Sequence, residues 1–142
     1  MDNIEFNDNI FYKIIQNEAP AYKVYEDEHF LVILDAYPAA LGHCLILPKE
    51  PAKDIFELSE SSAMGLYPLA KKIAIAIKQA TACDGINIIQ NNGKVSGQAV
   101  FYFHLHVVPR FLNDDIEIKT VQHKIEKQKF EELAANLQKL VS

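Results

Sequence analysis

Apolar and polar residues are distributed along the chain in a pattern that predicts short strands on either side of one long helix. Residues 22–26 and 30–34 are rich in β-branched and aromatic side chains, and the polar residues between them predict a hairpin turn. The apolar run 43–48 begins just after a glycine and predicts a third strand. A fourth strand is predicted at residues 86–90.

Three segments carry apolar residues at the three- and four-residue steps of a helix. Residues 10–15 predict a short helix that ends before Pro20. A long amphipathic helix is predicted from Ser59, a suitable N-cap, to about residue 81, with a bend at Pro68. The last helix is amphipathic and carries Phe130, Leu133, Leu137 and Leu140 on one side.

Residues 97–110 predict the central strand, because they are aromatic and β-branched and follow a polar loop. Alternation would place His104 and His106 on one face, about 6.5–7 Å apart along the strand. That face would also carry Gln98, Val100, Tyr102 and Val108, and the opposite, apolar face would carry Ala99, Phe101, Phe103, Leu105 and Val107. The spacing alone fits three interpretations: two histidines tolerated on a half-exposed strand, two metal ligands, or a nucleophile beside a group that holds a phosphoryl oxygen.

The order of the elements predicts an α+β fold. A short helix, three strands, a long helix, two strands and a final helix, with short links, favour an antiparallel five-stranded sheet with helices packed on one side. The chain contains no repeat or Gly/Ser linker, so residues 1–142 predict a single domain, in which 111–142 form a C-terminal extension ending in a helix.

Composition narrows the possible partners. The net charge of −5 gives no general attraction for nucleic acid. No apolar run is long enough to span a bilayer and the N-terminus lacks the pattern of a signal peptide, which predicts a cytoplasmic protein with no membrane partner. Cys44 and Cys83 lack the spacing of a zinc site and are predicted to be free thiols.

The central segment, Gly97-Gln98-x-Val100-x-x-x-His104-x-His106-Val107-Val108-Pro109-Arg110, resembles the signature of the histidine triad (HIT) family of nucleotide-binding proteins. Matching blocks occur in the same order from residue 10 to residue 110, and Tyr102 stands at the first triad position. The resemblance implies a homodimer in which the sheets of two subunits pair and each subunit binds a purine nucleotide such as AMP.

The resemblance also implies a role for each site residue. The base pocket would be lined by Ile10, Phe11, Ile14 and Ile33, which would equally suit a core. Asp35 would accept hydrogen bonds from the ribose. The phosphate would be surrounded by Asn91, the Gly97 backbone N–H, Gln98 and His106. His43, also among the implied nucleotide-binding residues, would lie near the nucleophile.

The implied activity is hydrolysis of a nucleoside phosphoramidate or phosphoanhydride through a nucleotidyl-histidine at His104, with His106 and Gln98 assisting. No cofactor is needed for this chemistry. Tyr102, and Ala99 where relatives carry Ser or Thr, leave open a second function, a nucleotide- or partner-binding dimer with little catalysis.

Many bacterial relatives carry a structural zinc. The four ligand positions align here with Asn9, Tyr12, Pro51 and Tyr102, none of which is a cysteine or histidine. The sequence therefore predicts a zinc-free protein.

Overall fold

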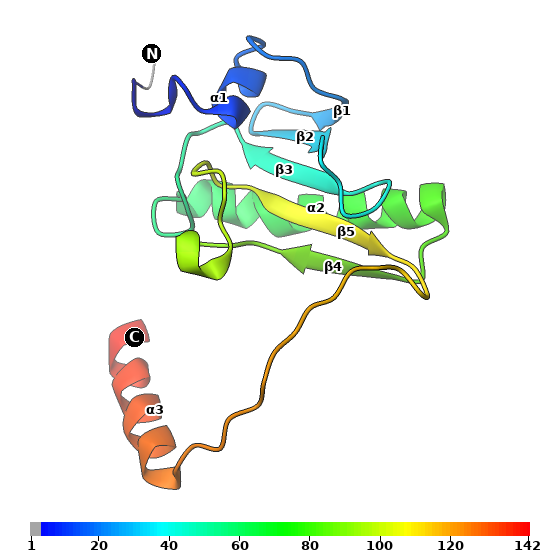
Figure 1. Ribbon diagram of the computed structural model, residues 1–142. Helices are drawn as coiled ribbons and strands as arrows, with labels where there is room; N and C mark the ends of the chain where they lie inside the picture. The colour runs from blue at the N-terminus through cyan, green and yellow to red at the C-terminus, as the bar shows by residue number, and fades with distance from the viewer. Residues whose placement is uncertain (1–3) are drawn as a thin grey trace.

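A computed structural model describes residues 4–142, and its elements follow the predicted order (Figure 1). The strands form one antiparallel five-stranded sheet in the order β1-β2-β3-β5-β4, so β1 and β4 are its edges. The predicted α+β fold is confirmed. The elements are η1 (Ile4–Phe6), α1 (Ile10–Ile15), β1 (Lys23–Glu26), β2 (Phe30–Leu34), β3 (Cys44–Pro48), α2 (Glu60–Thr81), β4 (Gly85–Ile89), η2 (Lys94–Ser96), β5 (Leu105–Arg110) and α3 (Lys127–Val141).

The sheet has a core on each face, because alternate residues of β2 and β3 point in opposite directions. Phe30 and Val32 of β2 pack with Leu69 and Ile73 of α2 on one face. On the other face, residues such as Leu31 pack beneath α1 and η1, in a cluster completed by Phe6, Tyr12, Ile14, Ile33, Leu45, Leu47 and Tyr102. The prediction that the helices lie on one side of the sheet was therefore wrong, because the short N-terminal helix covers the second face.

Helix α2 forms where its apolar spacing predicts. The Ser59 hydroxyl oxygen accepts a hydrogen bond from the Ser62 N–H (3.1 Å) and caps its first turn. The helix runs as one element through Pro68. Its Gly65 lies against the ring of Phe30, and a Cβ there would come within 2.9 Å of the ring, so this glycine lets the helix approach the sheet closely.

The central strand is shorter than predicted. β5 begins at Leu105, and residues 97–104 are irregular. The reason is that this segment bonds to the chain that follows β3: the Phe103 N–H donates to the Ala52 carbonyl (2.7 Å), and the Tyr102 hydroxyl donates to the Pro48 carbonyl. The predicted alternation of faces consequently fails before residue 104, and Phe101 is 41% exposed instead of joining the apolar core.

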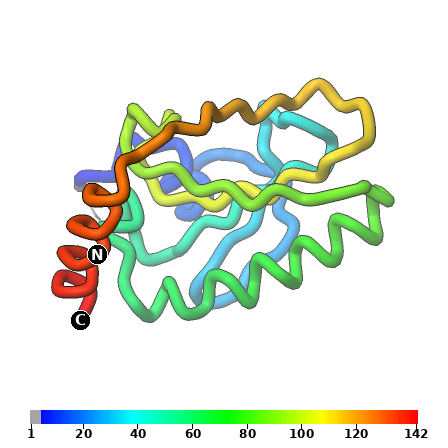
Figure 2. Tube along the Cα trace, turned by 90° about the horizontal axis from the view of Figure 1, so that it is seen from below, coloured from blue at the N-terminus to red at the C-terminus, as the bar shows by residue number. Residues whose placement is uncertain are grey.

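The chain beyond Asp115 leaves the sheet as an extended segment and ends in α3. The two views show this segment running along the β4 side of the molecule, from the end of the sheet where β5 finishes to the opposite end, where α3 lies (Figures 1 and 2). No residue of α3 is buried. Across residues 4–142, no helix has both the length and the apolar character needed to cross a bilayer.

Candidate active site

A cavity of about 510 Å³ opens on the sheet face that α1 covers. Its walls are mostly apolar, and the polar exceptions are one carboxylate and two imidazoles, Asp35, His104 and His106. The remaining lining residues are Ile10, Phe11, Ile14, Pro20, Ala21, Tyr22, Ile33, Leu34, Ala36, Tyr37, Leu45, Ala99 and Val100. An apolar cavity with a few convergent polar groups is the usual form of a small-molecule site.

His104 is buried at the irregular entry to β5, with its ring held in one orientation. Nδ1 lies 2.7 Å from the Tyr102 carbonyl oxygen, so it must carry the proton and donate it. The ring packs edge-on against Phe11, with centroids 5.0 Å apart. Because Nδ1 holds the proton, Nε2 carries the lone pair and is the atom available for attack.

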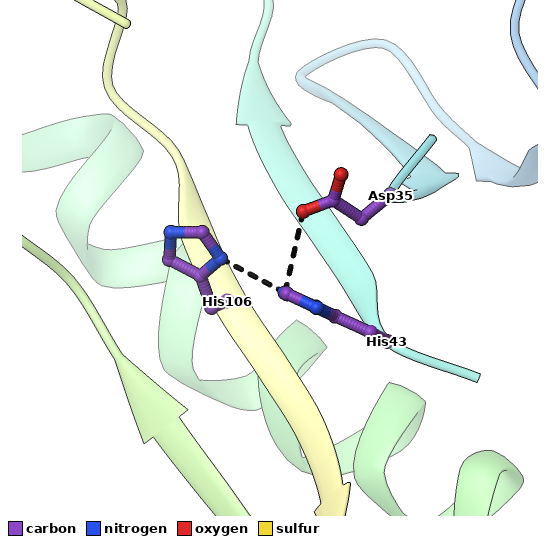
Figure 3. A group of neighbouring side chains, drawn as sticks. All are labelled: Asp35, His43 and His106. Atoms are coloured by element: carbon purple, nitrogen blue, oxygen red, sulfur yellow. Dashed lines mark hydrogen bonds and ion pairs between the residues drawn. The ribbon is translucent and has the colours of Figure 1, made fainter. Parts of the chain in front are cut away.

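His106 is held by a chain of hydrogen bonds that begins at the backbone, and Figure 3 shows the side-chain part of it. The Ala39 N–H donates to Nδ1 of His43 (3.0 Å), which places the His43 proton on Nε2. That Nε2 lies 2.9 Å from Nδ1 of His106 and 3.5 Å from a carboxylate oxygen of Asp35. His106 therefore accepts at Nδ1 and carries its own proton on Nε2.

The two ring systems of the pocket thus have opposite polarity. His104 offers a lone pair at Nε2, whereas His106 offers an N–H donor at Nε2. Their ring centroids are 4.9 Å apart. A nucleophile and a hydrogen-bond donor at this separation can contact the same tetrahedral phosphorus group.

Burial keeps all three imidazoles neutral. Desolvation is the main cause that lowers the pKa of His104, His43 and His106. The pKa of His106 falls to about 4, since the neighbouring His104 and His43 also disfavour a positive charge there. A neutral His104 keeps its lone pair at physiological pH.

Asp35, His43 and His106 also lie close enough together to suggest a cation site, since one potential ligand atom from each falls within 4.8 Å of the others. The hydrogen bonds argue against this use. The Ala39 N–H occupies Nδ1 of His43, so the Nε2 atom that faces the group is protonated and cannot ligate a metal. The arrangement fits a proton-ordering chain rather than a metal centre.

The structure brings most of the predicted base and ribose residues together. Ile10, Phe11, Ile14, Ile33 and Asp35 all line the cavity beside His104 and His106. Ile14 and Ile33 also belong to the core beneath α1, so the two alternatives considered for them coexist. One Asp35 oxygen accepts from the Tyr37 N–H (2.9 Å), which fixes the carboxylate at the cavity wall.

Of the residues predicted around the phosphate, His106 lines the cavity and the others do not. Gln98 is buried and outside the cavity lining: its amide nitrogen donates to the Lys53 and Val100 carbonyls (2.8 and 3.1 Å), and its oxygen accepts from the Gly93 N–H (2.8 Å). The Gly97 N–H donates to the Lys94 carbonyl (3.0 Å). These groups shape the loop that carries them.

Asn91, Gly97 and His43 likewise lie outside the lining. The side-chain amide of Asn91 lies beside Gly97, whose φ of +107° suits a glycine. His43 stands behind His106 and acts on the cavity only through it.

Sequence reasoning missed several lining residues. Pro20, Ala21 and Tyr22 precede β1, while Ala36 and Tyr37 follow β2, and none carries a signal of binding by itself. Val100 and Ala99 line the cavity from the irregular segment that was predicted as strand. These residues lie far apart in the sequence and meet only in the folded chain, where α1 lies next to the ends of β1 and β2.

Comparison with known proteins identifies the family of this fold. The HIT domain matches residues 16–113, most of the chain, including both cavity histidines. The chain belongs to the HIT family. Residues 1–15 and residues 114–142, which include α3, lie outside this match.

Curated relatives of this HIT protein include both uncharacterised proteins and named enzymes. An uncharacterised HIT-like protein of Borreliella burgdorferi is 39% identical over 92% of this chain and 96% of its own. The adenosine 5'-monophosphoramidase hnt1 of Schizosaccharomyces pombe is 38% identical over 71% of this chain and 73% of its own. The adenylylsulfatase HINT3 of Arabidopsis thaliana is 40% identical over 73% of this chain and 53% of its own.

Solved structures of HIT proteins superimpose on nearly the whole chain. A Streptococcus mutans protein matches with a TM-score of 0.90 and 42% identity, over 96% of this chain and 87% of its own. A HIT family protein from Bacillus anthracis matches with a TM-score of 0.91 and 36% identity, over 96% and 99%. A zinc-bound histidine triad protein from Mycobacterium smegmatis is 35% identical, with a TM-score of 0.73, over 93% and 94%.

The residues at the four aligned zinc positions do not fit that metal. Asn9 uses its side-chain oxygen to cap α1, accepting from the N–H groups of Phe11 and Tyr12 (2.9 and 3.3 Å). The rings of Tyr12 and Tyr102 are stacked with centroids 6.4 Å apart, and Phe6 packs edge-on against both. Pro51 offers no side-chain donor atom. Packing and capping occupy the space where a ligand set would stand.

Proposed function

We propose that this HIT protein is a hydrolase that releases a nucleoside monophosphate from a phosphoramidate or phosphoanhydride through a nucleotidyl intermediate on His104. The observation that carries the proposal is the opposite polarity of the two cavity histidines, each fixed by a hydrogen bond to a neighbouring group. The activities named for the Schizosaccharomyces and Arabidopsis relatives, a monophosphoramidase and an adenylylsulfatase, support the same class of reaction.

In the first step, the Nε2 lone pair of His104 attacks the α-phosphorus, and the bond from phosphorus to the leaving group breaks. The leaving nitrogen or oxygen takes the bonding electron pair and accepts a proton from solvent water, while the Nε2–H of His106 can donate a hydrogen bond to the reacting group. The Tyr102 carbonyl, which accepts from Nδ1 of His104, stabilises the positive charge that develops on the ring.

In the second step, water attacks phosphorus and the bond between phosphorus and Nε2 of His104 breaks. Nε2 recovers its lone pair, the nucleoside monophosphate carries the new oxygen, and the proton of water passes to solvent. Before the leaving group departs, the His106 N–H also favours the charge on a non-bridging oxygen. Each step therefore uses groups already oriented by the fold.

The nucleoside portion would lie in the apolar part of the cavity. Ile10, Phe11 and Ile33 offer flat apolar surface to a base, and a cavity of about 510 Å³ has the size of small-molecule sites. Asp35 has its second oxygen 3.5 Å from His43, and each carboxylate oxygen retains a lone pair for a ribose hydroxyl. We assign Asp35 to the ribose and the base pocket to a purine such as that of AMP.

The exposed edge of the sheet supports pairing with a second copy. β4 bonds to β5 on one side, and its other side is free of a strand within the described chain. An unpaired edge is a ready surface for antiparallel pairing about a two-fold axis. We therefore propose a homodimer joined through β4, with one nucleotide site per subunit.

The test compares His104→Asn with His29→Asn, a matched change at an exposed histidine outside the cavity. Release of AMP from adenosine 5'-phosphoramidate and from adenylyl sulfate is measured along with AMP binding by calorimetry. Loss of the nucleophile is expected to lower kcat by about 10³-fold or more while AMP affinity stays within a few-fold, and the His29→Asn control should leave both unchanged.

Three results would contradict the proposal or select the second function. Turnover that survives in His104→Asn removes the mechanism. If the wild-type protein binds AMP but hydrolyses neither substrate, it is a nucleotide-binding protein. This is the alternative suggested by Ala99 in the cavity wall, where relatives carry Ser or Thr. Absence of AMP binding removes both.

A further inference from the structure

Few side chains in the cavity carry a proton that a leaving group could receive. The described lining residues with a polar side chain are Tyr22, Asp35, Tyr37, His104 and His106. None of these described lining residues is a lysine, arginine, cysteine, serine or threonine. His104 cannot supply a proton, because its Nδ1 donates to the Tyr102 carbonyl and its Nε2 attacks with a lone pair. The supply of a proton therefore depends on the other four side chains.

His106 presents an N–H to the cavity, but the chain of hydrogen bonds behind it cannot replace that proton. If His106 gave up the proton on Nε2, its Nδ1 would need another from Nε2 of His43, which lies 2.9 Å away. His43 would in turn need the proton of the Ala39 N–H, which donates to its Nδ1 (3.0 Å). A backbone amide does not release its proton at neutral pH, so the transfer would leave a partly buried ring as an imidazolate anion. His106 consequently donates a hydrogen bond and keeps its proton.

The carboxylate and the two phenols lie at the proposed ribose site and the rim of the cavity. One Asp35 oxygen accepts from the Tyr37 N–H (2.9 Å), and the other lies 3.5 Å from the protonated Nε2 of His43, so the group is held as an acceptor. Tyr37 is 93% exposed and Tyr22 is 75% exposed. The Tyr22 carbonyl accepts from the N–H of Leu34, the residue before Asp35. Both phenols therefore belong to the solvent-exposed rim beside the ribose site.

We propose that the cavity selects substrates whose leaving group departs as a stable anion without receiving a proton. These are mixed anhydrides between a nucleoside monophosphate and an oxyacid such as sulfuric, carboxylic or phosphoric acid. The inference rests on the hydrolase proposed above and names its substrate class, anhydrides in preference to phosphoramidates. The observation that carries it is the end of the donor chain at the Ala39 N–H.

The two substrate classes differ in what must happen to the leaving atom. With an anhydride, the bond between phosphorus and Nε2 of His104 forms, the bond to the bridging oxygen breaks, and the oxygen keeps the electron pair as a stable anion. Any proton from water can arrive afterwards. With a phosphoramidate, the nitrogen takes the electron pair and must gain a proton as it departs, because an amide anion is too basic to leave. Solvent water supplies that proton, and the lack of a positioned acid costs about 10²–10⁴-fold in such a step.

The test measures the chemical step for adenylyl sulfate and adenosine 5'-phosphoramidate in single-turnover reactions of the full-length protein. His106→Asn keeps a side-chain N–H donor but offers no acidic proton, and Tyr22→Phe combined with Tyr37→Phe removes both phenols. His29→Asn is the matched control at an exposed histidine outside the cavity. A second pair of substrates, the 4-nitrophenyl and phenyl esters of AMP, varies the acidity of the leaving oxygen at similar shape. Circular dichroism verifies folding.

We expect wild type to cleave adenylyl sulfate about 10²-fold faster than the phosphoramidate or more, and the nitrophenyl ester faster than the phenyl ester. His106→Asn should slow both members of each pair by the same factor, because His106 assists without giving up its proton. The double tyrosine variant and the control should keep the wild-type ratio between the two rates of each pair.

Equal rates for adenylyl sulfate and the phosphoramidate in wild type overturn the inference while leaving the hydrolase intact. A variant that slows the phosphoramidate or the phenyl ester selectively also overturns it, because the replaced side chain is then the acid. If wild type cleaves none of the four substrates, the hydrolase fails and this inference fails with it.

Discussion

Nε2 of His43 lies 2.9 Å from Nδ1 of His106, and this contact decides which nitrogen of His106 carries the proton. The order begins at the Ala39 N–H, which has only Nδ1 of His43 as its partner in this chain of bonds. A backbone amide thus sets the polarity of a side chain at the cavity wall, two imidazoles away.

Replacing His43 should therefore disturb the reaction without removing a group that touches substrate. His43→Phe leaves Nδ1 of His106 without its donor, so the ring can hold its proton on either nitrogen. We expect kcat/KM to fall by about 10²-fold, the cost of losing one oriented donor at a developing charge. His43→Gln keeps an N–H donor and should recover part of the loss, and ¹⁵N NMR of His106 should report the tautomer in each variant. Equal activity in wild type and His43→Phe would disprove this positioning role.

The acid limb of the pH–rate profile should lie below the ordinary histidine range. The pKa of His104 is lowered mainly by desolvation, so the free enzyme keeps a neutral nucleophile below pH 6.5. We expect kcat/KM to remain level as pH falls from 8 to the ordinary histidine value near 6.5 and to decline only below it. A midpoint at or above 6.5 would mean that the imidazole is solvated in the working enzyme.

The same burial links stability to pH. The pKa of His106 is about 4 when folded and near 6.5 in an exposed histidine, so the unfolded chain takes up the proton first as pH falls. A depressed pKa contributes stability that is present above about pH 6.5 and is lost as pH falls toward 4. Urea unfolding at several pH values should show this loss in wild type and a smaller one in His106→Asn. Identical slopes would contradict the linkage.

Gln98 should behave as a structural residue of the loop. Gln98→Leu removes three hydrogen bonds of a buried side chain and leaves the Lys53 and Val100 carbonyls and the Gly93 N–H without this partner. We expect the free energy of unfolding to fall by about 2 kcal/mol or more. A Gln122→Leu control, at an exposed position between β5 and α3, should leave it unchanged. If Gln98→Leu keeps wild-type stability but loses turnover, Gln98 takes part in the reaction instead.

Tyr102 should matter for stability and leave the metal content unaffected. Tyr102→Phe keeps the packing against Phe6 and Tyr12 but removes the donor to the Pro48 carbonyl, a loss of about 1 kcal/mol. Tyr102→His should still bind no zinc, because Asn9, Tyr12 and Pro51 supply no ligand. Stoichiometric zinc in purified wild type, measured by elemental analysis, would contradict the zinc-free assignment.

How much the sequence predicted depends on how local each signal is. The strands β1 to β4 and all three helices follow from periodicity and caps, such as Ser59, because neighbours in sequence settle them. The prediction of a strand over residues 97–104 was wrong because their hydrogen-bond partners, Pro48 and Ala52, lie about fifty residues away in the sequence. Strand propensity depends on local residues and does not report such distant bonds. Gln98 lies outside the cavity lining for a similar reason, because it bonds to the distant Lys53 carbonyl.

The site was partly predictable. His104, His106 and Asp35 stand out by residue type and by resemblance, and they meet at one cavity. Tyr37 and Val100 line the cavity because separate loops converge there. The tautomers of His43 and His106 depend on the Ala39 N–H, and the type of residue at position 39 does not predict this backbone contact. The sequence therefore predicted which side chains react, whereas the orientation of their rings and protons follows only from the folded structure.

The most direct measurement is an acid-quench experiment with an adenylylated substrate labelled at the α-phosphate. Wild type mixed in excess with substrate and quenched within the first turnover should retain label on the protein, and mass spectrometry should locate one nucleotidyl group on the peptide that contains His104. Label absent from the protein while AMP is released, or label on His106 or His43, would contradict a covalent bond between His104 and phosphorus.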